Sequence, residues 1–116
     1  MVIAVIVFFI LMGLVALAAP QRITAIFGMA QLTPDGRNEV RAVYGGFGVA
    51  IGAVLTAALY DGALRPGVPL AVAAALFGMA GGRLVSALFE RPRRFYPAWF
   101  FCLAETVMGL ILWNWA

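Results

Sequence analysis

The stretch GMAGGRLVSALFE, residues 78–90, places an arginine inside a long apolar run. The run extends from Val68 to Phe89. It is long enough to cross the ~30 Å hydrocarbon core of a bilayer, which takes about 20 apolar residues in an α-helix. A charged side chain within such a helix is unfavourable unless it meets a partner inside the protein. The run therefore indicates a membrane-spanning helix, and the partner of Arg83 should mark the candidate site.

The composition of the whole chain indicates lipid rather than water as its solvent. Of 116 residues, 65% are hydrophobic and 11% are charged, and the mean hydropathy is +1.01. Soluble domains are about 45–50% apolar and about 25% charged. A small soluble domain leaves much of its surface in water and cannot bury so many apolar side chains. We therefore predict an all-α integral membrane protein that forms a single transmembrane domain over residues 1–116.

Four segments have the length and hydropathy of transmembrane helices. They are residues 1–19, 40–60, 68–89 and 95–115. Pro66 and Pro69 suit the start of the third helix, and Pro92 separates the third helix from the fourth. The first segment has an alternative interpretation, because ALAAP at residues 16–20 resembles a signal-peptidase site. A retained helix is favoured, since no basic stretch precedes the apolar run.

The segment between the first two helices, residues 21–32, is too short to span a bilayer. Its apolar residues recur at helical spacing, at Ile23, Ile26, Phe27 and Ala30. We expect a short helix lying in the membrane interface, followed by a turn at TPDG, residues 33–36. A plain surface loop is the alternative. The expected fold is thus a four-helix bundle with a short interfacial helix between helices one and two.

The distribution of arginine predicts the orientation of these helices. All eight basic residues are arginine, and six flank the first and third connections while one flanks the second. The six are Arg22, Arg37, Arg41, Arg91, Arg93 and Arg94, against Arg65. Basic residues are enriched in cytoplasmic connections, so both termini should face the outside. This bias also explains the net charge of +3 without a nucleic-acid partner, which would require several cations along one face.

Glycines at packing spacing occur on the second and third helices. Gly45, Gly48 and Gly52 share one side of helix two, and Gly78 and Gly82 lie four residues apart on helix three. Small residues let helix backbones approach closely in a bilayer, where close packing drives association. We expect these glycines to form packing faces within the monomer. A homodimer interface and space for a ligand are the alternatives.

Glu105 in the fourth helix is the predicted partner of Arg83. Counted from the Arg91–Arg94 connection at 1.5 Å per residue, Arg83 lies ~10 Å and Glu105 ~15 Å inside its helix. The long arginine stem can close that difference. An unpaired charge at mid-bilayer costs at least ~2.5–3.5 kcal/mol on insertion scales, so an internal ion pair is favoured. Protonation of Glu105 is the alternative.

Further polar residues lie toward the same membrane face as this pair. Ser86 follows Arg83 by one turn, and Glu39, Arg41 and Tyr44 occupy the first turns of helix two. We predict that all of them form one polar cluster with the Arg83–Glu105 pair. The alternative for Arg41 is a side chain that extends to the lipid headgroups.

Three motifs resemble a bacterial family known only as a domain of unknown function. They are EVRAVYGGFG at 39–48, GGRLVS at 81–86 and AETVMG at 104–109. Members of that family are small four-helix inner-membrane proteins, similar in outline to the DoxX-like group. The resemblance implies a multi-pass protein of the bacterial inner membrane and no particular reaction. In that membrane, the arginine distribution makes both termini periplasmic. It also implies importance for Glu39, Arg41, Tyr44, Gly45, Gly46, Arg83 and Glu105.

Three classes of function fit these features. The favoured one is binding of a lipid or other amphipathic molecule between the helices, with its polar head at the Arg/Glu cluster. The alternatives are an accessory or structural membrane subunit without a ligand, and a dimeric proton-coupled small-molecule transporter that uses Glu105. Catalysis is the least favoured, because the chain has no histidine and a single cysteine, Cys102. The same composition predicts neither a metal site nor a cofactor, and the expected partners are membrane lipids.

Overall fold

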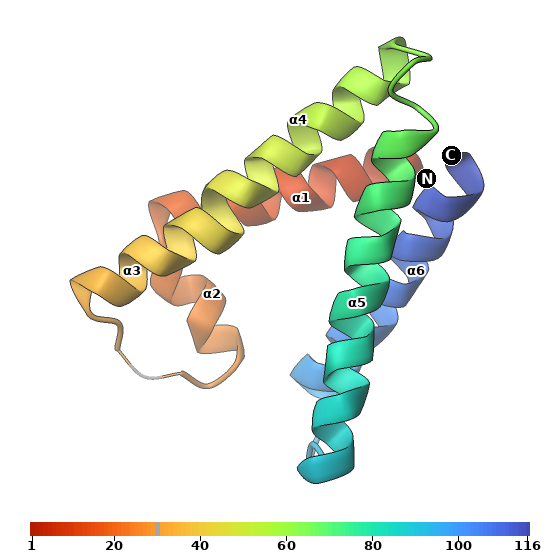
Figure 1. Cartoon of the computed structure of the whole chain (residues 1–116). Helices are drawn as coiled ribbons and strands as arrows, with labels where there is room; N and C mark the ends of the chain where they lie inside the picture. The colour runs from red at the N-terminus through yellow and green to blue at the C-terminus, as the bar shows by residue number, and fades with distance from the viewer. Residues whose placement is uncertain (30) are drawn as a thin grey trace. The chain divides into compact units, whose positions relative to one another are not determined.

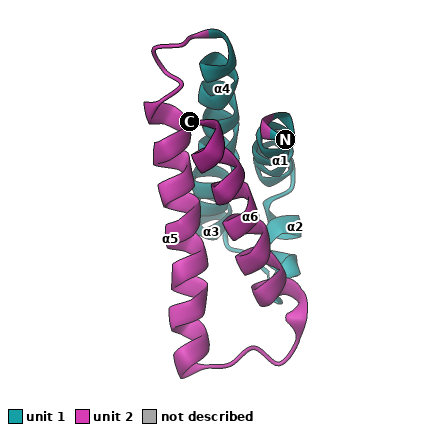
Figure 2. Ribbon diagram, turned by 90° about the vertical axis from the view of Figure 1, so that its right-hand side faces the viewer, with its two compact units in different colours: residues 1, 3–60 teal, residues 2, 61–116 magenta. Residues whose placement is uncertain are grey.

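A computed structural model describes residues 1–29 and 31–116. Within these ranges the secondary structure is helical and contains no strand, so the all-α prediction is confirmed. The chain divides into two compact units, which Figure 2 draws in separate colours. Unit 1 comprises Met1 and Ile3–Tyr60, and unit 2 comprises Val2 and Asp61–Ala116. Each unit is built on an antiparallel pair of long helices, and each is described by itself.

Across the described ranges, three helical stretches are long and apolar enough to cross a membrane. They are Pro34–Tyr60, Gly67–Phe89 and Phe95–Trp115. A fourth candidate exists only if α1 (Val2–Ala18) and α2 (Pro20–Ile26) count as one broken span. With 17 residues, α1 alone is ~25 Å long, less than a ~30 Å hydrocarbon core. The bounds of α1 lie within one residue of the predicted first segment, residues 1–19.

The break between α1 and α2 in unit 1 has a local cause. The two helices bend by 114° at Ala19, whose backbone is non-helical with φ −143° and ψ 71°. Pro20 follows it, and a proline disfavours the α conformation in the preceding residue. α2 ends at Ile26, before Gly28 takes a positive φ of 73° that favours glycine. The expected interfacial helix over residues 21–32 is thus shorter, and Ala30 of its apolar stripe lies outside the described residues.

The prediction of a turn at TPDG is wrong, because these residues begin a helix. Thr33 is the N-cap of α3 (Pro34–Val40), and its hydroxyl oxygen accepts a hydrogen bond from the Gly36 amide at 3.0 Å. Pro34 occupies the first turn, where its missing N–H is no loss, and Asp35 places a carboxylate near the positive end of the helix. The helix expected from residue 40 therefore starts six residues earlier.

From α3 the helix continues without interruption through η1 (Arg41–Gly46), a turn of π-helix, into α4 (Phe47–Tyr60). Glycines bring this helix close to α1. A Cβ added at Gly48 would lie 3.0 Å from the Phe9 carbonyl oxygen and 3.2 Å from Gly13 Cα. Because both neighbours are backbone atoms, a larger side chain at Gly48 would push the two helices apart.

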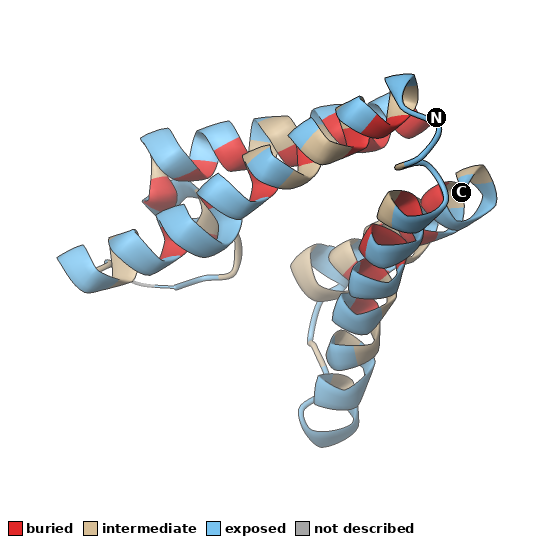
Figure 3. Cartoon of the chain, turned by 45° about the horizontal axis from the view of Figure 1, so that its top comes forward, coloured by how far each residue is buried: buried red, intermediate tan, exposed pale blue. Residues whose placement is uncertain are grey.

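The other two glycines expected to pack on helix two also face α1. A Cβ at Gly45 would lie 2.8 Å from the Leu17 side chain, and one at Gly52 would collide with Ile10. The buried residues follow the sides on which α1 and α4 face each other (Figure 3). Helix two therefore carries a glycine face for close packing, and its partner is α1.

Unit 2 consists of α5 (Gly67–Phe89), a short π-helical turn η2 (Phe95–Trp99) and α6 (Phe100–Trp115). α5 and α6 run antiparallel and side by side (Figures 1 and 2). Their close contact uses Gly109, where a Cβ would lie 2.5 Å from the Phe77 ring. By contrast, a Cβ at Gly78 or Gly82 would meet nothing within 4 Å. The glycines expected to pack on α5 therefore take no part in its contact with α6.

At the end of unit 2 that carries the C-terminus of α6, an arginine holds the hairpin together. Arg65 Nε donates to the Trp115 carbonyl oxygen at 3.3 Å, and its guanidinium carbon lies 4.6 Å from the centroid of the Trp115 ring. A cation is stabilised at a helix C-terminus by the partial negative charge of the carbonyls there. At the opposite end, Tyr96 is non-helical and followed by a cis peptide bond to Pro97.

Candidate functional site

Arg83 and Glu105 form an ion pair between α5 and α6. Arg83 Nε donates to Glu105 Oε1 at 2.8 Å, and Arg83 Nη2 donates to Glu105 Oε2 at 2.9 Å. The contact is therefore bidentate, the strongest geometry available to a guanidinium and a carboxylate. The Glu105 side chain is 4% exposed and that of Arg83 is 26% exposed. The structure thus gives the arginine of the apolar run the carboxylate partner that helix depth had indicated.

Neighbouring groups hold this pair in one register. The Arg83 guanidinium carbon lies 5.7 Å from the centroid of the Phe101 ring, one turn before Glu105 on α6. One turn deeper on α5, the Ala80 carbonyl oxygen accepts a weak bond from the Cys102 thiol at 3.7 Å. These contacts repeat along the antiparallel interface, so sliding either helix by one turn would break the ion pair as well as the packing.

The other residues of the predicted polar cluster, Ser86, Glu39, Arg41 and Tyr44, lie in both units. Ser86 belongs to unit 2 but is exposed. The other three belong to unit 1, where Glu39 is exposed and Tyr44 lies in the π-helical turn with 36% exposure. Their membership of one cluster with Arg83 and Glu105 stays a prediction.

Arg41 instead has a clear role within unit 1. Its Nε donates to the Leu17 carbonyl oxygen at 3.0 Å, in the last turn of α1. The last four carbonyls of a helix lack intrahelical partners, and a cation stabilises them. Because α1 ends at the 114° bend, Arg41 stabilises carbonyls that have no further turn of α1 to bond to.

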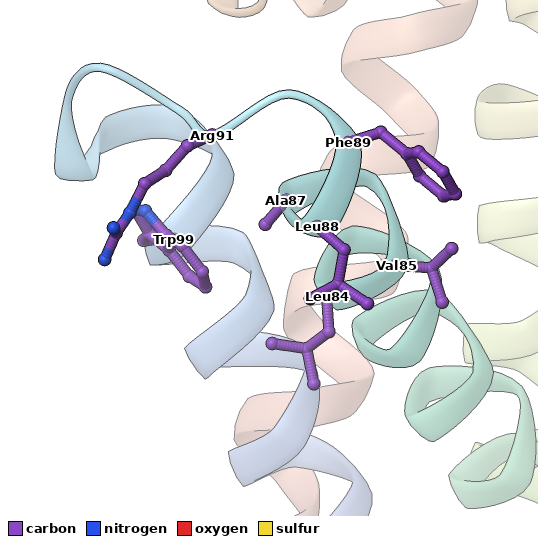
Figure 4. Close-up of a pocket in the computed structure, with 7 residues that line it drawn as sticks. All are labelled: Leu84, Val85, Ala87, Leu88, Phe89, Arg91 and Trp99. Carbon is purple, nitrogen blue, oxygen red and sulfur yellow. The ribbon is translucent and has the colours of Figure 1, made fainter.

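Unit 2 also carries an open groove of about 610 Å³ at the C-terminal end of α5. Its lining combines one arginine, one tryptophan and apolar side chains: Leu84, Val85, Ala87, Leu88, Phe89, Arg91 and Trp99. In Figure 4 the Arg91 and Trp99 side chains lie next to each other, and Ala87 projects from α5 on the side that faces them. Val85 and Phe89 project from the other side of the helix. The groove is thus amphipathic, with its charge at one wall.

The electrostatics around the groove are strongly positive. Residues 90–94, which join α5 to η2, contain Glu90 and three arginines, so three positive charges and one negative leave a net charge of +2. All three arginines are exposed, and Arg91 is the one that lines the groove. No carboxylate is among the groove's lining residues. Chemically, this arrangement suits a molecule with an anionic end and an apolar end.

Sequence reasoning missed this groove, although its residues were noticed for other reasons. The arginine bias assigns Arg91 a role in orientation, and its place in the groove has no separate signal in the sequence. A stronger signal was available in Leu84 and Leu88, an i, i+4 apolar pair directly before the basic connection. The kink at Tyr96, which determines where Trp99 lies, has no comparable signal.

Comparison with known proteins identifies the family. The chain belongs to the family described as Domain of unknown function (DUF4345), whose model matches residues 1–116. No curated protein and no solved structure matches the chain. The expected membership of a family of unknown function is therefore confirmed, and the match extends to the first helix, where no distinctive motif had been found.

Proposed function

We propose that this DUF4345 protein is a small multi-pass membrane protein that binds an amphipathic molecule in the groove of unit 2. The observation that carries the proposal is the lining of that groove, in which Arg91 and Trp99 accompany apolar side chains of α5, Leu84, Ala87 and Leu88 among them. Ligand sites are typically apolar concavities with a few polar groups that fix orientation. An amphipathic molecule matches this chemistry, with its polar end at Arg91 and its apolar end along Leu84 and Leu88.

Exposed apolar side chains support a membrane location. Leu84, Leu88, Leu103 and Leu110 of the α5–α6 hairpin are each at least half exposed. A soluble monomer rarely leaves so much apolar surface open to water. We place the protein in the bacterial inner membrane as a four-helix bundle, DoxX-like in outline, with periplasmic termini. The arginine bias then puts the groove at the cytoplasmic face.

In this proposal the Arg83–Glu105 pair supports the groove rather than binding the ligand. Both oxygens of Glu105 accept from Arg83, so the pair joins α5 to α6 close to the groove. Leu84 follows Arg83 directly and lines the groove. A fixed helix register keeps that wall in place when the groove is empty. The polar residues Glu39, Arg41 and Tyr44 would act within unit 1.

A second candidate function is an accessory subunit without a ligand. The specific observation in its favour is the same bidentate pair, which satisfies Glu105 completely without any further group. Proton-coupled transport by a homodimer would require this pair to open in every cycle, because a proton on Glu105 removes one acceptor from Arg83.

The groove can be tested with Trp99 as an internal probe. In a Trp113→Phe, Trp115→Phe background, Trp99 is the remaining tryptophan, and a brominated amphiphile bound in the groove quenches its fluorescence. We expect quenching that saturates at a low fraction of brominated molecules. Ala87→Phe fills the groove and should abolish this saturable component.

The matched control is Ala74→Phe, the same change at an exposed position nearer the start of α5. It should leave the saturable component unchanged. Quenching that rises in simple proportion to the brominated fraction, alike in both variants, would mean contact with bulk lipid and no bound ligand.

A further inference from the structure

We infer that the groove of unit 2 selects an anionic phospholipid and that Arg91 is the side chain that recognises its phosphate. The inference rests on the proposed function and adds to it the class of the bound molecule and the residue that selects it. Arg91 carries the single charge in the lining, and no carboxylate lines the groove with it.

The charges around the groove favour an anionic over a zwitterionic headgroup. A guanidinium binds phosphate oxygens through a planar fork of N–H donors, which gives both strength and orientation. Residues 90–94 carry a net charge of +2, from three arginines and one glutamate. A headgroup that also bears an ammonium ion would bring a like charge toward Arg91, Arg93 and Arg94. An anionic headgroup meets no such repulsion.

The apolar part of the groove favours a membrane lipid over a soluble phosphate ester. Leu84 and Leu88 lie one turn apart, about 6 Å along α5, and provide a wall for the upper part of an acyl chain. Trp99, next to Arg91 in Figure 4, has the amphipathic ring that is enriched at headgroup depth. A soluble phosphate ester would use Arg91 alone and leave this wall without a partner.

Arg93 offers a matched control within the same connection. It is exposed, carries the same charge as Arg91 and is not part of the groove lining. If the arginines acted only by attracting an anionic surface, removing either charge would weaken binding equally, by about fivefold. If Arg91 binds the phosphate directly, its loss removes charge-assisted hydrogen bonds and should weaken binding at least about tenfold.

The experiment uses the full chain with the Trp113→Phe, Trp115→Phe background in phosphatidylcholine vesicles. Brominated phosphatidylglycerol or brominated phosphatidylcholine is titrated in, and quenching of Trp99 is measured. We expect saturable quenching with a preference for phosphatidylglycerol of at least about tenfold. Arg91→Gln should lose this preference, and Arg93→Gln should keep most of it. Circular dichroism confirms that both variants retain their helices.

Four results would overturn the inference in distinguishable ways. Equal losses in Arg91→Gln and Arg93→Gln would reduce the effect to surface electrostatics. Saturable quenching of equal strength by both lipids would refute headgroup selection and leave the proposed function standing. Absence of saturable quenching with either lipid would refute both. Displacement of the brominated lipid by soluble glycerol phosphate would assign the site to a soluble phosphate ester instead.

Discussion

Removing either member of the Arg83–Glu105 pair should destabilise the chain, and the two changes should differ in size. Arg83→Met leaves the Glu105 carboxylate, 4% exposed, without either of its hydrogen bonds. Breaking a buried pair in this way costs roughly 3–5 kcal/mol. Glu105→Gln leaves an arginine that is only partly buried, 26% exposed, and whose long side chain can extend toward the headgroups, and the glutamine oxygen still accepts one bond. Its cost should be lower, about 1.5–3 kcal/mol, typical of a lost hydrogen bond to a charged group.

The double variant Arg83→Met, Glu105→Gln distinguishes a direct interaction between the two side chains from two independent losses of stability. With both charges removed, no uncompensated group remains, and a neutral pair of similar volume is often tolerated. We therefore expect the double variant to be more stable than Arg83→Met alone, with a coupling energy of about 1–3 kcal/mol. Unfolding in detergent micelles of increasing dodecyl sulfate content, followed by circular dichroism, measures each free energy.

Arg93→Met is the control, since it removes an exposed arginine from the same unit and should change stability little. Strictly additive single effects would refute the reasoning, because they would mean that the pair contributes no interaction energy. So would a Glu105→Gln variant as unstable as Arg83→Met, because the difference in burial predicts the opposite.

Three further outcomes are expected. Gly48→Leu should lower the melting temperature in detergent, because the added side chain meets the backbone of α1 and overpacking costs about 1–3 kcal/mol. Gly78→Leu should have a smaller effect, because a Cβ at Gly78 meets nothing within 4 Å. Equal shifts in the two variants would contradict the packing assignment. A cysteine at Gly36 in a Cys102→Ser background should react with an impermeant maleimide only from the cytoplasmic side, and labelling from the periplasm would reverse the orientation. Arg41→Met should speed hydrogen exchange in the last turn of α1, because it removes about 0.3–1 kcal/mol of stabilisation from that helix end. Arg41→Lys should retain part of the protection. Unchanged exchange in Arg41→Met would refute the capping role.

The features that sequence predicted well depend on one short connection. α5 and α6 are joined by few residues, so they had to be antiparallel neighbours, and helical rise then placed Arg83 and Glu105 at similar depth. Hydropathy also located α5 and the start of η2 correctly to within a residue. These predictions succeed because each rests on a single continuous helix or a tight turn.

The features that sequence missed depend on local backbone geometry. Hydropathy does not register the 114° bend at Ala19, which separates α1 from the short helix α2. The four residues TPDG are typical of both a turn and a helix N-terminus, and the capping hydrogen bond of Thr33 selects the helix. The groove depends on where the kink at Tyr96 places Trp99, and the capping role of Arg41 depends on a contact with a residue far away in sequence.

The length of the uninterrupted helix from Pro34 to Tyr60 determines how this protein responds to bilayer thickness. Its 27 residues measure ~40 Å, about 10 Å more than a typical hydrocarbon core. A hydrophobic mismatch of this size is relieved either by tilt or by leaving one end outside the hydrocarbon. Asp35, Arg37 and Glu39 occupy the first two turns, so that end should stand among the headgroups and in the water above them. A thicker membrane would draw these charged turns toward the hydrocarbon, which makes this end of the helix the part of the fold that is sensitive to membrane thickness.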